Sequence, residues 1–211
     1  MTKPHISLAQ SYWRAHLRPH DFALDMTCGN GHDTKFLSEC LPSGMVYAFD
    51  IQERAIGNTR AIVGDSVKLF HRSHDDLPPL PSPPRLIVYN LGYLPGGDKT
   101  ITTRRESTVR SLAQCLHLLA PDGAISITCY PGHDEGLLEE AAVLAWVQKI
   151  PQDQWNVCFT QWLNRPRAPS LVWVRRKETL RQCYLNAKKD KEQLEAQKDW
   201  EVTVADGSND W

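Results

Sequence analysis

The chain has 211 residues, of which 41% are hydrophobic, and a formal net charge of −1 at pH 7. This length predicts one domain with a sizeable core, or one domain and a tail, and the charge excludes binding to nucleic acid through overall positive charge. No apolar run is long enough to span a membrane, so we expect no membrane partner. The six cysteines form no C-x-x-C pair, which indicates reduced core thiols in a cytoplasmic protein.

The N-terminal third of the chain predicts a ligand-binding loop. Apolar residues at helical spacing predict a helix over residues 5–17. A strand over residues 22–26 then breaks into a loop that contains Gly29 and Gly31, and a helix over 34–41 follows. A strand, a tight glycine turn and a helix can bring bare backbone N–H groups against a ligand.

The residues around this loop favour one class of cofactor. The next strand, residues 46–50, closes on Asp50, which is placed to accept hydrogen bonds from a ribose. Thr34 occupies the position where a dinucleotide-binding loop has its third glycine, and Asp25 and Asp33 add negative charge. Acidic groups disfavour a bound pyrophosphate and suit a sulfonium with a cationic amino-acid end. The loop therefore predicts S-adenosylmethionine rather than NAD, and the simplest alternative is a glycine turn that binds no ligand.

The middle of the chain adds two candidate positions. A helix over residues 52–63 and a strand over 67–71 lead to a polar turn, in which Asp75 is a candidate to hold an adenine amino group. A buried strand over 86–89 ends at Asn90, where ligands bind in open α/β sheets. The side-chain carbonyl of Asn90 can accept a proton from an amine and orient its lone pair. The alternative is an asparagine that caps a turn before Gly92.

The last third completes the sheet. A helix with an apolar stripe over 109–119 precedes a strand over 124–130, and His133 follows the carboxyl end of that strand. A helix over 139–149 precedes two strands, 155–162 and 170–176, which we expect to form a hairpin with Asn164 at its ligand-binding end. Together the elements predict an α/β, Rossmann-like fold with a mostly parallel seven-stranded sheet and a C-terminal antiparallel hairpin. We expect one domain over 1–177 and a charged tail, helical or disordered, over 178–211.

Five parts of the sequence resemble the MnmM (YtqB-like) class I methyltransferases, which are often labelled "putative rRNA methylases". They are residues 25–34 (DMTCGNGHDT), 47–52 (YAFDIQ), 90–99 (NLGYLPGGDK) and 130–133 (YPGH), together with Asn164. The resemblance covers residues 5–177 and implies transfer of a methyl group from S-adenosylmethionine to the 5-aminomethyl nitrogen of uridine 34 in tRNA. The product would be 5-methylaminomethyl(-2-thio)uridine.

The resemblance and the residue patterns together assign the site. The residues expected to bind the cofactor are Asp25, Thr27, Gly29, Asn30, Gly31, Asp33, Asp50, Gln52, Asp75 and Asn90. The expected catalytic residues are Asn90, Tyr93 and His133, and no metal is expected. The residues expected to bind the substrate are Leu91, Tyr93, Pro95, Arg104, Arg105, His133 and Asn164. The chain departs from the family at Asp134–Glu135, at Arg167–Ala168 and in its added tail, and these departures concern the rim of the substrate site rather than the cofactor site.

The expected partner is a tRNA anticodon stem-loop, and a homodimer is one option for the oligomeric state. An aminomethyl group is largely protonated near neutral pH, and His133 has a side-chain pKa suited to accepting that proton. A wobble base must leave its stack, and Tyr93 and Tyr130 are candidates to hold it. Phosphate contacts are expected from cationic side chains near the strand ends, namely Lys99, Arg104, Arg105, Arg165 and Arg167.

Two other functions fit the sequence. The first is methylation of an exocyclic amine of adenine in rRNA or DNA, for which Asn90 and Tyr93 have the right spacing but lack the intervening prolines. The second is a cofactor-binding module without catalysis, against which the intact loop after Asn90 argues.

Overall fold

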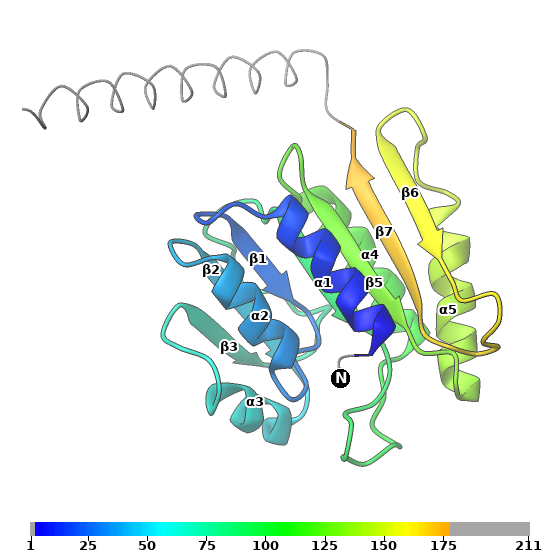
Figure 1. Cartoon of the computed structure of the whole chain (residues 1–211), viewed down its shortest axis with the longest axis horizontal. Coiled ribbons are helices and arrows are strands. Elements are labelled where there is room, and N and C mark those ends of the chain that lie inside the picture. Colours follow the sequence, from blue (N-terminus) through cyan, green and yellow to red (C-terminus); the bar gives the residue numbers. More distant parts are fainter. Residues whose placement is uncertain (1–2, 178–211) are drawn as a thin grey trace, which may run out of the picture. The chain divides into compact units, whose positions relative to one another are not determined.

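The computed structural model describes residues 3–177, and the tail predicted over 178–211 lies outside these residues (Figure 1). The predicted α/β fold is confirmed, with helices on both faces of one sheet. The helices are α1 (Pro4–His16), α2 (His32–Cys40), α3 (Glu53–Arg60), α4 (Arg105–Leu118) and α5 (Asp134–Val147). The strands are β1 (Phe22–Asp25), β2 (Met45–Asp50), β3 (Val67–His71), β4 (Leu86–Asn90), β5 (Ala124–Cys129), β6 (Trp155–Thr160) and β7 (Ser170–Arg176).

The sheet has seven strands in the order β3-β2-β1-β4-β5-β7-β6. The first five in this order are parallel, and β7 lies antiparallel between β5 and β6, so the predicted C-terminal hairpin is confirmed. The strand order reverses between β1 and β4, which makes their carboxyl ends the topological switch point where open α/β sheets bind ligands.

Alternation along the strands builds two hydrophobic layers. In β4, Leu86 and Val88 pack with residues of α1, α2 and α3, whereas Ile87 and Tyr89 pack with residues of α4 and α5. Figure 1 shows the first three helices in front of the sheet and the other two behind it. Both faces of β4 are therefore buried, which explains why its sequence is a continuous apolar run rather than an alternating one.

Helix α1 extends from the carboxyl edge of the sheet to the amino edge. At its start, the ring of His5 lies edge-on to Tyr130, with 5.5 Å between the ring centroids, just after the end of β5. In its middle, Gln10 donates a hydrogen bond of 2.8 Å to Asp33 at the start of α2. The first turns of α1 thus lie beside the switch point.

The other end of α1 is fixed by an ionic cluster around Arg85. The Arg85 guanidinium donates to the main-chain oxygen of His16 and pairs with Asp21 and Asp122 at the amino edge. His16 itself is buried, and burial, followed by the charges of Arg85 and Arg175, lowers its pKa to about 4. His16 is therefore held neutral in the folded protein near physiological pH.

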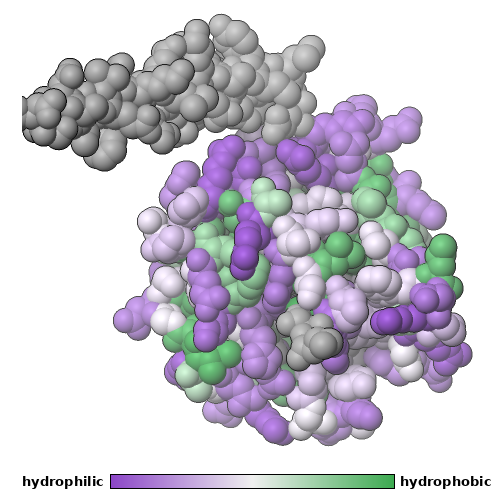
Figure 2. All heavy atoms as spheres, viewed as in Figure 1, coloured by the Kyte–Doolittle hydropathy of each residue, from purple (hydrophilic) through white to green (hydrophobic). Residues whose placement is uncertain are grey.

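No helix among residues 3–177 has the length and apolar character needed to cross a bilayer. The face of the molecule seen in Figure 2 mixes polar and apolar side chains without a continuous apolar band.

Candidate functional site

The site is built on the glycine loop between β1 and α2. Gly31 is the residue before α2 and has a φ of +82°, in the left-handed region, and a Cβ on it would lie 2.7 Å from the Cα of Thr59. Gly29 also has a positive φ, +54°. A side chain at position 31 would therefore be strained and would clash with the backbone of α3, which explains why the turn needs glycine there.

Three carboxyl groups surround this loop, as the sequence predicts. Asp25 is completely buried and accepts hydrogen bonds from the Thr34 hydroxyl at 2.6 Å and the Thr27 N–H at 3.2 Å. Burial, with the nearby charge of Asp33, raises its pKa to about 7. Burial also raises the pKa of Asp33 and of Asp50. A cluster of carboxyl groups that resist ionisation would be stabilised by a cation.

Asp50 connects the end of β2 to both neighbouring loops. One carboxylate oxygen accepts the Gly29 N–H at 3.0 Å, and the other accepts the Gln52 N–H at 2.9 Å. Asn30 extends from the same loop, accepting from Asn58 and donating to the Pro95 carbonyl at 3.1 Å. The predicted cofactor residues of the first two strands are therefore brought together.

Asn90 lies at the centre of the switch point with its side chain fixed. Its main-chain N–H donates to the Thr27 hydroxyl at 2.7 Å, and its amide nitrogen donates to Asp33 at 3.0 Å. The second carboxylate oxygen of Asp33 accepts from Gln10. The amide nitrogen of Asn90 is the donor in this contact with Asp33, so the amide oxygen is left to act as an acceptor elsewhere.

The loop after Asn90 is held by a buried acid on α5. The Gly92 N–H donates to the Thr103 hydroxyl at 2.7 Å, and this hydroxyl donates to Glu139 at 2.7 Å. The second oxygen of Glu139 accepts from the Thr108 hydroxyl at 2.6 Å. Glu139 is only 1% exposed, and burial raises its pKa despite these two donors. A relay of two hydrogen bonds therefore connects α5 to the residues beside Asn90.

Sequence reasoning missed Glu139, Thr103 and Gln10. The one available signal for Glu139 was its place among the apolar residues of its helix, because a buried acid needs partners. The sequence did not say which hydroxyls would supply them.

His133 and Tyr93 come together beside this loop, with 5.5 Å between their ring centroids. Helix α5 begins at Asp134, five residues before the predicted start at 139, and His133 is its N-cap. Its Nδ1 accepts the Gly136 N–H at 3.1 Å, while its Nε2 is buried and has no hydrogen-bond partner among the described residues. In the neutral ring this bond places the proton on Nε2, so His133 presents a donor, and accepting a proton would require the Gly136 bond to break.

Tyr93 is 36% exposed, and the Lys99 ammonium lies 5.5 Å from its ring centroid. Leu91 is buried in the hydrophobic core, and Pro95 contributes its main-chain oxygen to the contact with Asn30. Among the predicted substrate residues of this loop, Tyr93 and Pro95 are exposed, and Tyr93 presents the accessible aromatic ring.

Asp75 lies apart from the glycine loop in its contacts. Its carboxylate accepts from the Ser73 hydroxyl and from Arg110 of α4, at 2.6 Å from one guanidinium nitrogen. Burial opposes ionisation of Asp75, but the Ser73 hydrogen bond and the Arg110 pair outweigh it and hold its pKa below the usual range. These contacts show a role for Asp75 in fixing the turn to α4.

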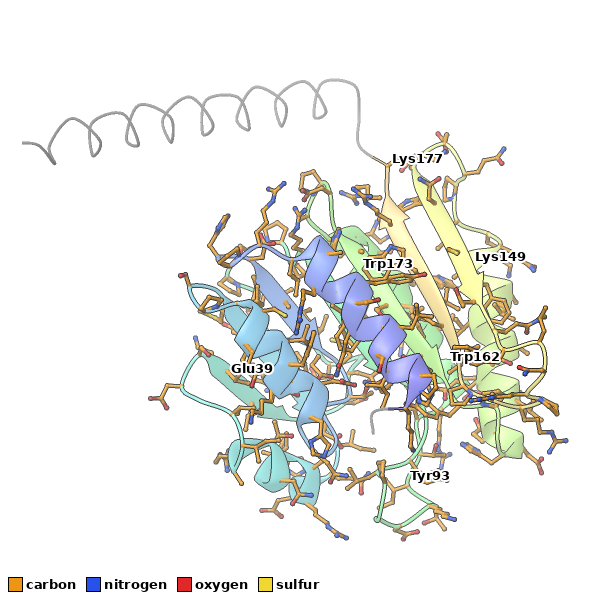
Figure 3. All side chains as sticks on the ribbon, viewed as in Figure 1. Glu39, Tyr93, Lys149, Trp162, Trp173 and Lys177 are labelled. Carbon is orange, nitrogen blue, oxygen red and sulfur yellow. The ribbon has the colours of Figure 1, made fainter. Side chains whose placement is uncertain are left out.

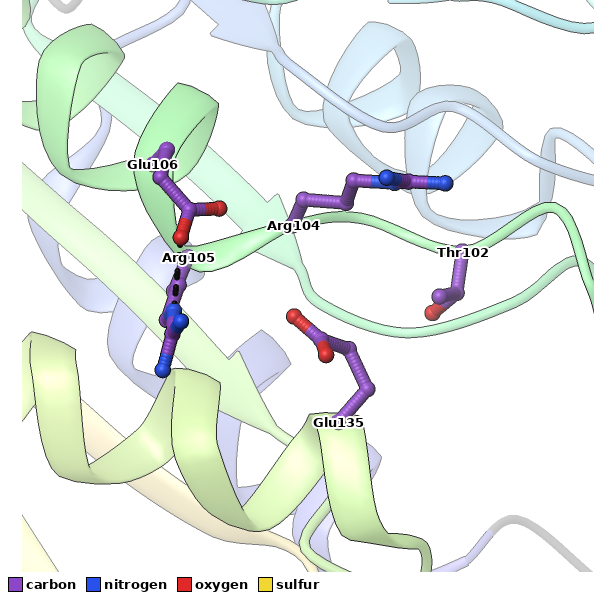
Figure 4. A pocket seen from close by; sticks show the side chains of 5 residues that line it. All are labelled: Thr102, Arg104, Arg105, Glu106 and Glu135. Atoms are coloured by element: carbon purple, nitrogen blue, oxygen red, sulfur yellow. Dashed lines mark hydrogen bonds and ion pairs between the residues drawn. The ribbon is translucent and has the colours of Figure 1, made fainter.

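Arg104 and Arg105 line an open cavity of about 380 Å³ at the start of α4, together with Thr102, Glu106 and Glu135 (Figure 4). Arg105 pairs with Glu106 at 2.6 Å.

Asn164 is exposed in the loop between β6 and β7. Among the described residues, no group of three or more histidine, cysteine or acidic side chains has the arrangement to hold a metal ion.

The chain matches known methyltransferases in sequence and in structure. A family model described as "putative rRNA methylase" matches residues 46–176. A curated relative from Arabidopsis thaliana, named "tRNA (mnm(5)s(2)U34)-methyltransferase, chloroplastic", is 35% identical over 188 residues, which cover 81% of this chain and 69% of the relative.

Two solved structures are similar to most of this chain. A putative rRNA methylase from Clostridium thermocellum has a TM-score of 0.78 and 32% identity, covering 84% of this chain and 100% of that one. A structure described as "a putative methyltransferase" from Streptococcus mutans, solved with S-adenosylhomocysteine (SAH), has a TM-score of 0.73 and 32% identity at the same coverage. The chain belongs to the family described as "putative rRNA methylase" and, with it, to the class I methyltransferases that use S-adenosylmethionine.

Proposed function

We propose that this protein transfers a methyl group to the 5-aminomethyl nitrogen of uridine 34 in tRNA, in its 2-thio or oxygen form, in the cytoplasm. The observation that carries the proposal is the orientation of Asn90, whose amide nitrogen is bound by Asp33 and whose oxygen is left to accept a hydrogen bond. The name of the Arabidopsis relative supports the same substrate.

The residues around the glycine loop fit the cofactor by their chemistry. Asp25, Asp33 and Asp50 form a cluster whose ionisation a sulfonium and an ammonium would favour, and which would repel a pyrophosphate. Asp50 would hold the ribose, and the loop from Gly29 to Gly31 would hold the amino-acid end. When bound, S-adenosylmethionine supplies the methyl group as an electrophile on sulfur.

The side chains of this chain then have to orient the amine. Asn90 would accept an N–H of the neutral amine and direct the lone pair toward the methyl group. An ammonium cannot attack, so the site has to take the neutral amine or pass the proton to an acceptor. His133 carries its proton on Nε2, a buried nitrogen with no partner among the described residues, so it would donate to an oxygen of a uracil ring that enters beside Tyr93.

The RNA would be held by the residues at the rim of this edge. The exposed ring of Tyr93, with Lys99 against it, is a surface on which an extruded base can stack. Arg104 and Arg105 would contact phosphates, since they are exposed cations beside the same loop.

The test is methyl transfer from labelled S-adenosylmethionine to tRNA that lacks the final wobble methyl group, followed by nucleoside mass spectrometry. Wild-type protein is expected to convert aminomethyluridine to its N-methyl form. Asp50→Ala should lose cofactor binding, whereas Asn90→Ala should keep it and lose turnover. Asn156→Ala, an exposed asparagine on β6, is the matched control and should behave as wild type.

Transfer to rRNA or DNA adenine but not to tRNA would reject the wobble substrate and favour the second candidate, an adenine N-methyltransferase. The spacing of Asn90 and Tyr93 and the family description keep that candidate in the test. Cofactor binding without transfer to any nucleic acid would reject both.

A further inference from the structure

We infer that the loop between β6 and β7, residues 161–169, forms a second base-binding site that holds the unpaired nucleotide next to the methylated uridine. This inference rests on the proposed function and adds a subsite to it. The register of the hairpin places the loop at the carboxyl edge of the sheet, beside the proposed active site, because Ser170 pairs with Cys129 at the end of β5 and Leu171 pairs with Thr160. Figure 3 shows Trp162 and Tyr93 toward the same end of the sheet.

The loop covers a cavity of about 240 Å³ against the start of α5, lined by Pro131, Leu137, Trp162, Arg165, Arg167 and Ser170 among others. This cavity adjoins the site through residues 130 and 131. Pro131 lines the cavity, and the preceding Tyr130 lies against Gly92, whose Cβ, if present, would be 3.7 Å from that of Tyr130. A nucleotide in the cavity would therefore be a neighbour of one held at Asn90.

The cavity has the chemistry that unpaired RNA requires. Trp162 is half-buried, and the Arg165 guanidinium lies over its ring, 5.8 Å from the ring centroid, so the loop offers a flat aromatic and a planar cation in contact with each other. Bases stack on such groups without regard to sequence. Arg165 and Arg167 are both exposed and can contact phosphate oxygens.

One acid also lines the cavity, and it already has a partner. Glu140 accepts a hydrogen bond from the Ser170 hydroxyl. Two exposed cations against one partnered carboxylate favour a polyanion as the occupant. Leu163, in the same loop, is 91% exposed, so it adds an apolar contact for a base but no continuous apolar surface for a protein partner.

The experiment couples a protein change to the removal of one base. Anticodon stem-loop RNAs are made with the target uridine and with an abasic nucleotide immediately before or immediately after it. The affinity of each RNA is measured for wild type, Trp162→Ala, Trp162→Phe, Arg165→Ala and Phe159→Ala. Phe159 is the matched control, an exposed aromatic on the same hairpin that does not line the cavity.

Wild-type affinity is expected to fall about tenfold when one of the two flanking bases is removed, as for the loss of one stacked base. Trp162→Ala should bind the intact RNA about tenfold more weakly and show no further loss with the abasic RNA. Trp162→Phe, which keeps a ring, should retain most of the affinity and of the abasic effect. Phe159→Ala should match wild type.

The inference is overturned if wild type is indifferent to both abasic RNAs, or if Trp162→Ala shows the full abasic effect. If thermal unfolding shows that Trp162→Ala is not folded, Arg165→Ala takes its place in the comparison with Trp162→Phe. Arg165→Ala should then bind the intact RNA more weakly than Trp162→Phe and lose more of the abasic effect, and equal behaviour of the two variants would overturn the inference. Failure of the proposed function looks different, because wild type would then methylate no tRNA. Specific capture of a protein in place of RNA, with no abasic effect, would also reject the inference.

Discussion

The relay from Glu139 through Thr103 to Gly92 can be tested with a pair of isosteric substitutions. Thr103→Val removes the hydroxyl that accepts from Gly92 and donates to Glu139. Thr108→Val removes the other donor to Glu139 but does not contact Gly92. If the relay positions the loop after Asn90, the two variants should differ in activity, although each removes one hydrogen-bond donor from the same buried acid.

The magnitudes follow from the groups left without partners. Each variant leaves Glu139 with one donor, and hydrogen bonds to charged groups contribute about 1.5–3 kcal/mol to stability. Thr103→Val also leaves the Gly92 N–H without a hydrogen-bond partner, which costs about 1–3 kcal/mol of stability when that group stays away from water. We expect the free energy of unfolding to fall by about 2 kcal/mol for Thr108→Val and by about 3 kcal/mol for Thr103→Val.

The assay is urea unfolding combined with steady-state methyl transfer. Thr103→Val should lower kcat about tenfold or more, because small displacements of catalytic groups have large effects on rate, with little change in the KM for the cofactor. Thr108→Val should keep kcat within about twofold. Thr103→Ser, which keeps the hydroxyl, should restore activity. Equal losses of kcat in the Thr103→Val and Thr108→Val variants would show that Glu139 acts on stability alone and would refute the relay.

Three further predictions concern the loop, pH and RNA. Gly31→Ala should lower the free energy of unfolding by about 2–4 kcal/mol, because Gly31 has a left-handed φ and a Cβ there would clash with α3. Gly57→Ala, in open space on α3, should raise the free energy of unfolding by about 0.5–1 kcal/mol, and chemical unfolding measures both changes. His16 becomes protonated near pH 6.5 in the unfolded chain but only near pH 4 in the folded protein. As the pH falls between these values, the free energy of unfolding of wild type should therefore drop by up to about 3 kcal/mol relative to that of His16→Gln, and equal pH profiles of the two proteins would contradict this. Replacing Arg104 and Arg105 together with alanine should weaken tRNA binding and reduce the slope of log K against log salt by about 1 to 2, and an unchanged slope would remove them from the interface.

The order of elements could be predicted because each strand and helix carries its own periodicity. The sequence patterns around β1, β2 and β4 were clear, since apolar runs end there on a glycine turn, on Asp50 and on Asn90. The hairpin of β6 and β7 was also predicted. The start of α5 was wrong by five residues, because Gly136 within it and the preceding Pro131 to His133 resemble a turn, whereas His133 caps the helix through Gly136.

The contacts within the site could be predicted only in part. Position at a strand end identifies Asn90 as a candidate, but not the Asp33 and Gln10 pair that orients its amide, because Gln10 comes from a helix that precedes the sheet. Likewise, an acid such as Glu139 is visible in the sequence, but its partners depend on how two helices pack. Periodicity specifies which face of an element is buried, and tertiary packing decides which polar groups meet there.

The orientation of α1 has a practical consequence for working with this protein. The helix begins at the carboxyl edge of the sheet, with His5 beside Tyr130, and ends at the amino edge, with His16 beside Arg85. Anything fused directly before Pro4 would therefore be attached next to the residues proposed to receive RNA. β7, by contrast, ends at Arg176, which pairs with Trp155 at the amino edge of the sheet. Affinity tags, fluorophores and surface-immobilisation groups should accordingly be attached after β7 when RNA binding is to be measured.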